Sequence, residues 1–367
     1  MTFFDVHAGY AACDIPALMA SVTAAAVARA IAVERRTPLD YLALLSPAAV
    51  PCLEAMARRA HELTTRQFGR VVQLFTPLYL ANHCVNACRY CGFNAGNAMR
   101  RNKLSLDAVE AEAKVIAAMG LQHVLILTGE SRTHSPVSYL ADCIAVLRRH
   151  FASVSLEVYP LSEEEYRELV LAGADGVTLF QETYDQAVYA DMHPKGPKRD
   201  YRNRLEAPER AGAASMRTLG IGALLGLTDW RSEAFFTGLH ADYLQRTFPG
   251  AEVSISTPRL RPQVGGFRAP VTVTEVDLVQ YITAARLFLP RAGITVSTRE
   301  RPGLRDHLPS LGVTRLSAGV STAVGGRGSG DHTPPQFEIA DSRSVEAMSA
   351  MLTASGYQPV RKDWQCL

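Results

Sequence analysis

The chain has 367 residues, of which 47% are hydrophobic and 20% are charged, and its formal net charge at pH 7 is +2. This composition is typical of a folded globular protein with room for one large domain or two ordinary ones. The small net charge argues against a nucleic-acid partner or an acidic membrane surface. No apolar stretch reaches the roughly 18–20 residues of a membrane span, and Met1–Asp5 carries no basic segment before an apolar run, so we expect neither a membrane segment nor a secretory signal.

Residues 1–70 have the apolar spacing of helices and contain no strand-like run. Helices are predicted at Ile15–Val33, Pro38–Leu45 and Ala48–Phe68. We therefore expect residues 1–70 to form an N-terminal helical extension.

From residue 71 onward, short apolar runs alternate with helix-like segments such as Leu106–Met119 and Ser162–Leu171. Strands that are apolar throughout are typical of parallel sheets covered on both faces. They are predicted at Val72–Leu80, His123–Thr128, Val154–Pro160, Gly176–Phe180, Ile221–Leu227, Val253–Ser256, Ile294–Ser297 and Arg315–Ala318. Eight such units predict an α/β fold, a (β/α)8 TIM-type barrel over residues 71–322.

The last part of the chain, residues 323–367, is predicted to be a short C-terminal tail made of a closing loop and a helix. Its glycine-rich run Gly325–Gly330 lacks the strand and helix that flank a phosphate-binding loop, so we interpret it as a flexible closing segment. The helix is predicted near Ser344–Ala354.

Three cysteines lie within eight residues directly after the first predicted strand, as Cys84-x3-Cys88-x2-Cys91. A fully ligated [4Fe–4S] cluster needs four thiolates, so three would leave one iron open to an external ligand. Zinc is the alternative, but it prefers four tetrahedral ligands, and His83 stands awkwardly close to Cys84 to be the fourth. Thiolates and an oxygen-labile cluster fit a reducing compartment, so we expect a cytoplasmic protein. The other cysteines show no metal-like spacing: Cys13, Cys52, Cys143 and Cys366.

The cysteine spacing, with the aromatic Tyr90 just before the third cysteine, resembles that of the radical S-adenosylmethionine (SAM) enzymes. The resemblance implies a single [4Fe–4S] cluster held by Cys84, Cys88 and Cys91, with SAM chelating the open iron. It also implies that the reduced cluster cleaves SAM to a 5′-deoxyadenosyl radical, and it places Tyr90 beside the cofactor.

Several further residues follow predicted strands, where the active sites of barrels lie. Gly129 and Glu130 match the superfamily segment that contacts the amino group of SAM. Glu182 could bond the ribose hydroxyls, and Leu224 could pack against adenine. Arg204 matches an arginine that pairs with the SAM carboxylate, although a surface pair at i,i+4 is an equal alternative.

Residues after the late strands suggest an anchor for an amino acid. A buried arginine at a barrel mouth needs an anion, and the carboxylate of an amino acid would supply it. Arg299 and Arg259 are the candidates, with Ser317 as a hydrogen-bonding partner for an amino group. The alternative for Arg299 is that it and Glu300 neutralise charges at the rim.

As a set, these segments resemble the tyrosine lyases of thiamine biosynthesis, the 2-iminoacetate synthases. The resemblance covers nearly the whole chain and rests on the cysteine motif with Leu74–Asn82, Leu127–Glu130, Gln181–Tyr184, Pro258–Pro262, Ser297–Glu300 and Lys362–Trp364. It implies that the Cα–Cβ bond of L-tyrosine is cleaved to 2-iminoacetate and p-cresol, while SAM yields 5′-deoxyadenosine and methionine. It also implies a thiazole synthase as protein partner, and reduced flavodoxin or ferredoxin as electron donor.

Alternatives stay open at this point. The hydrogenase-maturation tyrosine lyase carries a second cluster on a C-terminal cysteine motif, whereas this tail offers only Cys366. A tryptophan lyase shares the barrel and the anchoring arginine and serine. The family usually shows Pro-Gly-Gly-Tyr where this chain has Val324–Arg327, which leaves the choice of aromatic substrate open. A non-catalytic metal-binding or electron-transfer protein would turn over no SAM.

Overall fold

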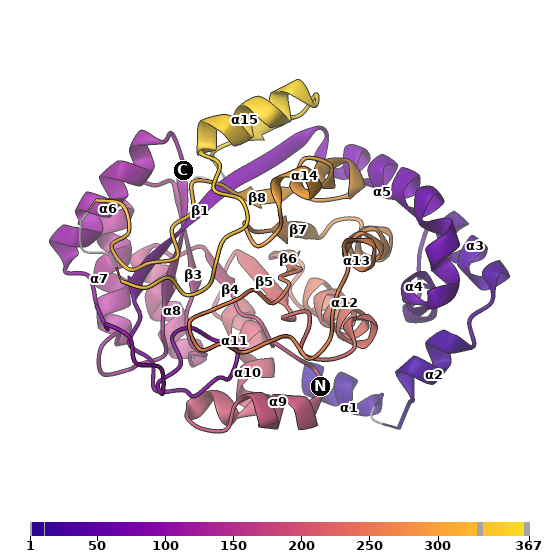
Figure 1. Cartoon of the computed structure of the whole chain (residues 1–367), viewed down its shortest axis with the longest axis horizontal. Helices are drawn as coiled ribbons and strands as arrows, with labels where there is room; N and C mark the ends of the chain where they lie inside the picture. The colour runs from indigo at the N-terminus through magenta and orange to yellow at the C-terminus, as the bar shows by residue number, and fades with distance from the viewer. Residues whose placement is uncertain (1, 11, 329–332, 363–367) are drawn as a thin grey trace.

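The computed structural model describes residues 2–10, 12–328 and 333–362, and its centre is a barrel of parallel strands (Figure 1). In chain order the strands are β1 (Val71–Ala81), β2 (His123–Thr128), β3 (Ser153–Glu157), β4 (Gly176–Thr178), β5 (Thr218–Gly222), β6 (Glu252–Ser256), β7 (Gly293–Val296) and β8 (Arg315–Ser317). Each strand pairs with the next, and β1 pairs with both β2 and β8, so the sheet closes on itself. The predicted barrel is confirmed.

Helices between the strands cover the outside of the barrel (Figure 1). Short polar side chains start several of them: Ser105 accepts a hydrogen bond from the backbone of Ala108, and Ser162 forms a capping box with Glu165. The α-helices after β1 are α6 (Leu106–Ala118), α7 (Val137–Leu147), α8 (Glu163–Ala172), α9 (Gln186–Met192), α10 (Tyr201–Leu205), α11 (Ala207–Ala213), α12 (Trp230–Thr247), α13 (Glu275–Phe288), α14 (Pro302–Arg305) and α15 (Val345–Ala354).

The N-terminal extension consists of α1 (Phe3–Gly9), α2 (Ile15–Ala20), α3 (Ala24–Ala32), α4 (Pro38–Leu45), a 3₁₀ turn (Pro47–Cys52) and α5 (Leu53–Phe68). The single helix predicted at Ile15–Val33 is wrong. It is broken because the Ser21 hydroxyl bonds back to the Leu18 carbonyl, and Thr23 caps a new helix. The helix predicted from Ala48 starts instead as a 3₁₀ turn, since Pro51 lacks the N–H that an α-helix needs.

The extension packs against α12 and α13 on one side of the barrel. Tyr41 on α4 donates a hydrogen bond to the Ala234 carbonyl at 2.9 Å, and its ring fills the place where a side chain at Gly238 would lie. Among the described residues no single helix is long and apolar enough to cross a membrane. The helical segments Pro38–Leu45 and Pro47–Phe68 reach the length and composition of a membrane span only when taken together. They are bent by 81° at the break between them.

Several strands differ from the predicted bounds; the third, for example, was expected to reach Pro160 but ends at Glu157. The fifth strand was expected at Ile221–Leu227, but the ladder ends at Gly222, and residues 223–227 are buried by loops rather than by neighbouring strands. A segment buried by loops and a segment buried by neighbouring strands show the same apolar pattern in the sequence. An unpredicted strand, β9 (Gln358–Val360), pairs in parallel with the start of β1 on the outside of the barrel. Its three residues carry no periodic signal.

After β8 a segment crosses the mouth of the barrel. The Gln336 N–H donates to the Thr322 carbonyl, and the Ala340 N–H donates to the Thr298 carbonyl. The side chain of Arg327 turns inward and donates to the Thr76 hydroxyl at 2.9 Å, so it ties the segment to the barrel. The end of the glycine-rich run, Ser329 and Gly330, lies outside the described residues, as do Asp363, Trp364 and Cys366.

Candidate active site

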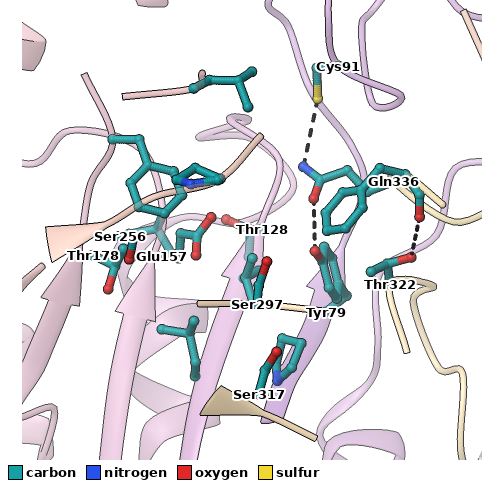
Figure 2. A pocket seen from close by; sticks show the side chains of 18 of the residues that line it. Tyr79, Cys91, Thr128, Glu157, Thr178, Ser256, Ser297, Ser317, Thr322 and Gln336 are labelled. Carbon is teal, nitrogen blue, oxygen red and sulfur yellow. Dashed lines mark hydrogen bonds between the residues drawn. The ribbon is translucent and has the colours of Figure 1, made fainter. Parts of the chain in front are cut away.

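A cavity of about 240 Å³ opens at the carboxyl ends of the barrel strands. Every strand of the barrel contributes to its wall, together with the loop after β1 and the closing segment. Figure 2 shows side chains from these elements converging on one space. All but one of the residues selected from the sequence line it: Cys84, Cys88, Tyr90, Cys91, Gly129, Glu130, Glu182, Arg204, Leu224, Arg299 and Ser317.

The cysteine loop is held in place by backbone contacts with two neighbouring segments. The Val85 N–H donates to the Glu130 carbonyl at 2.9 Å, and the Ala87 N–H donates to the Lys195 carbonyl at 3.1 Å. Gly129 allows the close approach after β2, because a Cβ there would lie 2.4 Å from the His83 carbonyl oxygen. The loop is therefore positioned by the fold before any cofactor binds.

The three thiols of the motif line the cavity, with Cys88 buried and Cys84 and Cys91 half-buried. Burial raises the pKa of Cys88 to about 12 and also raises the pKa of Cys91. The Cys88 and Cys91 thiols therefore favour the neutral form without a metal, and ligation would make them thiolates. No group of three described His, Cys, Asp or Glu side chains is arranged to hold one metal ion, but each thiolate of a cubane cluster binds its own iron.

His83, the residue weighed as a zinc ligand, does not line the cavity. Its ring stacks on His134, with 3.9 Å between the centroids. The thiol of Cys91 has a different neighbour, since the amide of Gln336 donates to its sulfur at 3.7 Å (Figure 2). The remaining described cysteines are free and lie away from the cavity wall: Cys13, Cys52 and Cys143.

Glu130 is fixed beside the cysteine loop by Asn86. The Asn86 amide donates to the Glu130 carboxylate at 2.6 Å, and its carbonyl accepts from the Lys198 N–H at 3.0 Å. Asn86 therefore joins the loop after β1, the end of β2 and the segment before α10. A carboxylate held this way can accept hydrogen bonds from an ammonium group.

Glu182 lies at the centre of a buried charge cluster. Its carboxylate is 2.7 Å from the Lys198 ammonium and 3.4 Å from the Arg204 guanidinium. Burial opposes ionisation of Glu182, but these two cations outweigh it, so the pKa of its carboxyl is lowered. The backbone of Glu182 has φ +72°, a left-handed conformation that is rare outside glycine and is often found at functional sites.

The aromatic residue before Cys91 is anchored by a histidine. His193 donates from Nδ1 to the Tyr189 carbonyl, so its Nε2 accepts from the Tyr90 hydroxyl at 2.8 Å. Burial lowers the pKa of His193 to about 3, which keeps the ring neutral. Next to it, Leu224 packs with Met192 and Leu227 in a small apolar cluster. This cluster, against which Tyr90 packs, offers an apolar surface to the cavity.

Arg299 is a half-buried cation just beyond the end of β7. Its guanidinium stacks on the Phe337 ring at 3.6 Å from the centroid and donates to the Arg259 carbonyl at 3.4 Å. It forms no ion pair with a described carboxylate, and burial lowers its pKa. A cation in this position can bind an anion that enters the cavity.

Arg259 is placed differently. Its guanidinium forms a bidentate ion pair with the buried Glu300, and the remaining guanidinium nitrogen, Nη1, donates to the Val273 carbonyl. It does not line the cavity. Ser317 does line it, but its hydroxyl accepts a hydrogen bond from the Thr298 N–H at 3.0 Å. Of the two arginines, only Arg299 is exposed to the cavity.

Sequence reasoning missed several residues of the site. Asn86 and Lys198 carry no motif of their own, and Gln336 is 245 residues away from the cysteine that it contacts. Tyr79 donates to Gln336 at 2.8 Å and so completes a chain of polar groups that ends at Cys91 (Figure 2). Glu157 gave a usable signal, since it is a lone carboxylate in the third apolar run.

Two family models match the chain. The radical SAM superfamily matches residues 78–237, and the biotin and thiamin synthesis associated domain matches residues 256–358. The chain is 42% identical to 2-iminoacetate synthase of Escherichia coli K12 over 352 residues, which cover 96% of this chain and 93% of the relative. The corresponding enzyme of Salmonella typhimurium LT2 is 41% identical over the same shares.

A solved structure has the same fold. The crystal structure of HydG, a maturase of the [FeFe]-hydrogenase, superposes with a TM-score of 0.89 at 31% sequence identity. The superposition covers 95% of this chain and 78% of that one. The likeness therefore extends over the barrel and the elements that flank it.

Proposed function

The chain belongs to the 2-iminoacetate synthase family of the radical SAM superfamily, and from this premise we propose which of its residues carry out the reaction. The reaction cleaves L-tyrosine to 2-iminoacetate and p-cresol for the thiazole of thiamine, and it uses a [4Fe–4S] cluster and SAM. The observation that carries the proposal is the meeting of three cysteines, a carboxylate cluster and an unpaired arginine in one cavity.

Cys84, Cys88 and Cys91 would hold one [4Fe–4S] cluster and leave one iron for SAM. Their thiols line one cavity on a loop that the fold already holds, which supports this assignment. When bound, the cluster and SAM supply a 5′-deoxyadenosyl radical, and the protein supplies position and charge. No fourth cysteine lines the cavity among the described residues.

Three residues would orient SAM. Glu130, held by Asn86, would accept from the amino group, and Glu182 would accept from the ribose hydroxyls. Arg204 would bind the SAM carboxylate, although in the protein alone it contributes to the charge cluster on Glu182. Tyr90 and Leu224 would pack against the adenosyl group, because both belong to the apolar cluster at that end of the cavity.

Arg299 would anchor the carboxylate of tyrosine. Of the two arginines considered from the sequence, Arg299 has no ion pair with a described carboxylate, whereas Arg259 is already bound to Glu300. Ser317 would assist from β8, where its oxygen has a second lone pair free for a substrate amino group. The cavity walls would exclude water from the reacting atoms.

The proposal also covers the domain organisation of the chain, its protein partners and its compartment. The organisation comprises a helical extension at residues 1–70, a barrel at 71–322 and a closing segment at 323–367. A thiazole synthase would consume 2-iminoacetate, and reduced flavodoxin or ferredoxin would supply electrons, in the cytoplasm. The support is chemical, because the cluster needs a low-potential donor and the product is a reactive imine.

The test is anaerobic incubation of the reconstituted protein with SAM, reductant and either tyrosine or tryptophan, followed by chromatography. We expect p-cresol from tyrosine and no indolic product from tryptophan. The reverse result would favour the tryptophan lyase. Paramagnetic resonance with and without SAM separates both enzymes from an electron-transfer protein, whose cluster signal would not respond to SAM.

A further inference from the structure

A polar recess extends from the cavity at the ends of β3, β4 and β6. It is formed by Glu157, Thr178 and Ser256, which Figure 2 shows close together. Strand register explains the grouping, because Leu156 pairs with Val177 and the next residues along both strands are Glu157 and Thr178. The recess therefore follows from the strand pairing.

The neighbouring strand β5 packs closely against the residues of the recess. Its inward positions near the recess are glycines: a Cβ on Gly220 would lie 2.6 Å from the Thr178 hydroxyl, and one on Gly222 would lie 2.5 Å from the Ser256 carbonyl. The inside of a TIM barrel is normally filled by bulky branched side chains. Here glycines let the Thr178 side chain and the β6 backbone pack against β5, where any Cβ would collide, so Thr178 and Ser256 stay at the cavity wall beside Glu157.

Glu157 differs from the other carboxylates of the cavity. Glu130 is bonded to Asn86, and Glu182 is bonded to Lys198 and Arg204. Glu157 has no hydrogen bond or ion pair with any described residue, although it lines the cavity. Burial, with the charge of Glu182, raises its pKa to about 7. The side chain is half-buried on the cavity wall, so a ligand that enters the cavity is the expected partner of its carboxylate.

The position of Glu157 matches one end of tyrosine. Strands β3 and β7 are four places apart in a closed barrel of eight, so Glu157 and Arg299 lie on opposite walls. A tyrosine anchored at Arg299 by its carboxylate would extend its ring across the lumen toward β3. We propose that Glu157, with Thr178 and Ser256, binds the phenol hydroxyl of tyrosine and selects against phenylalanine. This proposal rests on the proposed function.

The test measures binding without turnover. The cluster-loaded protein with SAM, but no reductant, is titrated calorimetrically with L-tyrosine and with L-phenylalanine, which differ only in the phenol hydroxyl. Glu157→Ala should weaken tyrosine binding about 10- to 100-fold, because a hydrogen bond to a charged group is lost. Its phenylalanine affinity should stay within about threefold. Glu157→Gln keeps an acceptor and should retain most of the preference for tyrosine.

The controls separate this proposal from others. Exposed Glu168→Ala should bind both amino acids as the unaltered protein does. If Glu157→Ala weakened tyrosine and phenylalanine equally, Glu157 would instead hold the common ammonium group; if it changed neither, the recess would not be part of the substrate site. Ser256→Ala provides a second variant should Glu157→Ala fail to fold. Absence of p-cresol from the unaltered enzyme would refute the proposed function separately.

Discussion

The two arginines at the barrel mouth illustrate what a single residue contributes. Arg259 has a carboxylate partner within the chain, and Arg299 has only an aromatic ring and a carbonyl oxygen. Both are arginines near the barrel mouth, yet only the second can bind an incoming anion without breaking an existing ion pair. The difference in partners, rather than residue type, distinguishes a binding group from a structural one.

Replacing Arg299 by alanine should remove tyrosine cleavage and spare part of the SAM chemistry. We expect p-cresol formation to fall at least about 100-fold, because the carboxylate loses the one cation of the cavity wall that has no carboxylate partner among the described residues. Chromatography of p-cresol and 5′-deoxyadenosine from the same reaction measures both effects. Undiminished p-cresol output from Arg299→Ala would show that this residue does not anchor the substrate.

Arg259→Ala serves as the contrasting variant. It leaves buried Glu300 without its cation, so the free energy of unfolding should drop by about 3 kcal/mol. The KM for tyrosine should change little in the protein that folds. A large rise in KM without loss of stability would move the anchoring role from Arg299 to Arg259.

At the scale of elements, the cluster loop depends on a close contact between two backbones. The end of β2 and the start of the cysteine loop touch at Gly129, where no side chain intervenes. Glu130, Asn86 and Lys198 then join this contact to the segment before α10. The loop is therefore fixed by three elements that are far apart in sequence.

Gly129→Ala should separate those elements. The added Cβ would lie 2.4 Å from the His83 carbonyl oxygen, and backbone atoms there can yield only by moving the loop. Overpacking of this kind costs about 1–3 kcal/mol, so iron and sulfide per chain after reconstitution should fall below about half of normal. Gly250→Ala, where a Cβ meets nothing within 4 Å, should load a full cluster. Equal iron content in both variants would contradict the argument.

At the scale of the whole molecule, buried histidines couple stability to pH. Burial lowers the pKa values of His193 and His240 to about 3. Each group therefore stabilises the fold fully above its unfolded pKa near 6.5, and that stability is lost as pH falls toward 3. Glu157 and Glu233 act in the opposite sense, since burial raises their pKa values to about 7 and stability is lost as pH rises from about 4.5 to 7.

His240→Phe isolates one of these contributions. Relative to the unaltered protein, the free energy of unfolding of the variant should rise by about 1.4 kcal/mol for each pH unit below 6.5, because the variant has no imidazole to protonate. Loss of the hydrogen bond with Tyr184 should lower the free energy of unfolding of the variant by the same amount at every pH. Denaturant unfolding of both proteins from pH 4 to 8 measures the difference. Parallel curves would show that the pKa of His240 is the same in the folded and the unfolded protein.

The predictions from sequence succeeded where a signal is local. Strand β2 and helix α4 have the predicted bounds, because an uninterrupted apolar run and a proline-started, capped apolar segment are strong local signals. The cysteine spacing led directly to the loop that lines the cavity. The break between α2 and α3 and the end of β5 were missed, since local capping and burial by loops outweigh the apolar pattern there.

By itself the sequence determined the barrel, the cysteine motif and the likeness to an aromatic amino-acid lyase, because each depends on residue order or on short-range periodicity. Only the tertiary structure decided which polar residues meet. It paired Arg259 with Glu300, left Arg299 facing the cavity, and set Glu157 beside Thr178. Ion pairs and cavities join residues distant along the chain, and their energies depend on burial and distance, which no sequence pattern records.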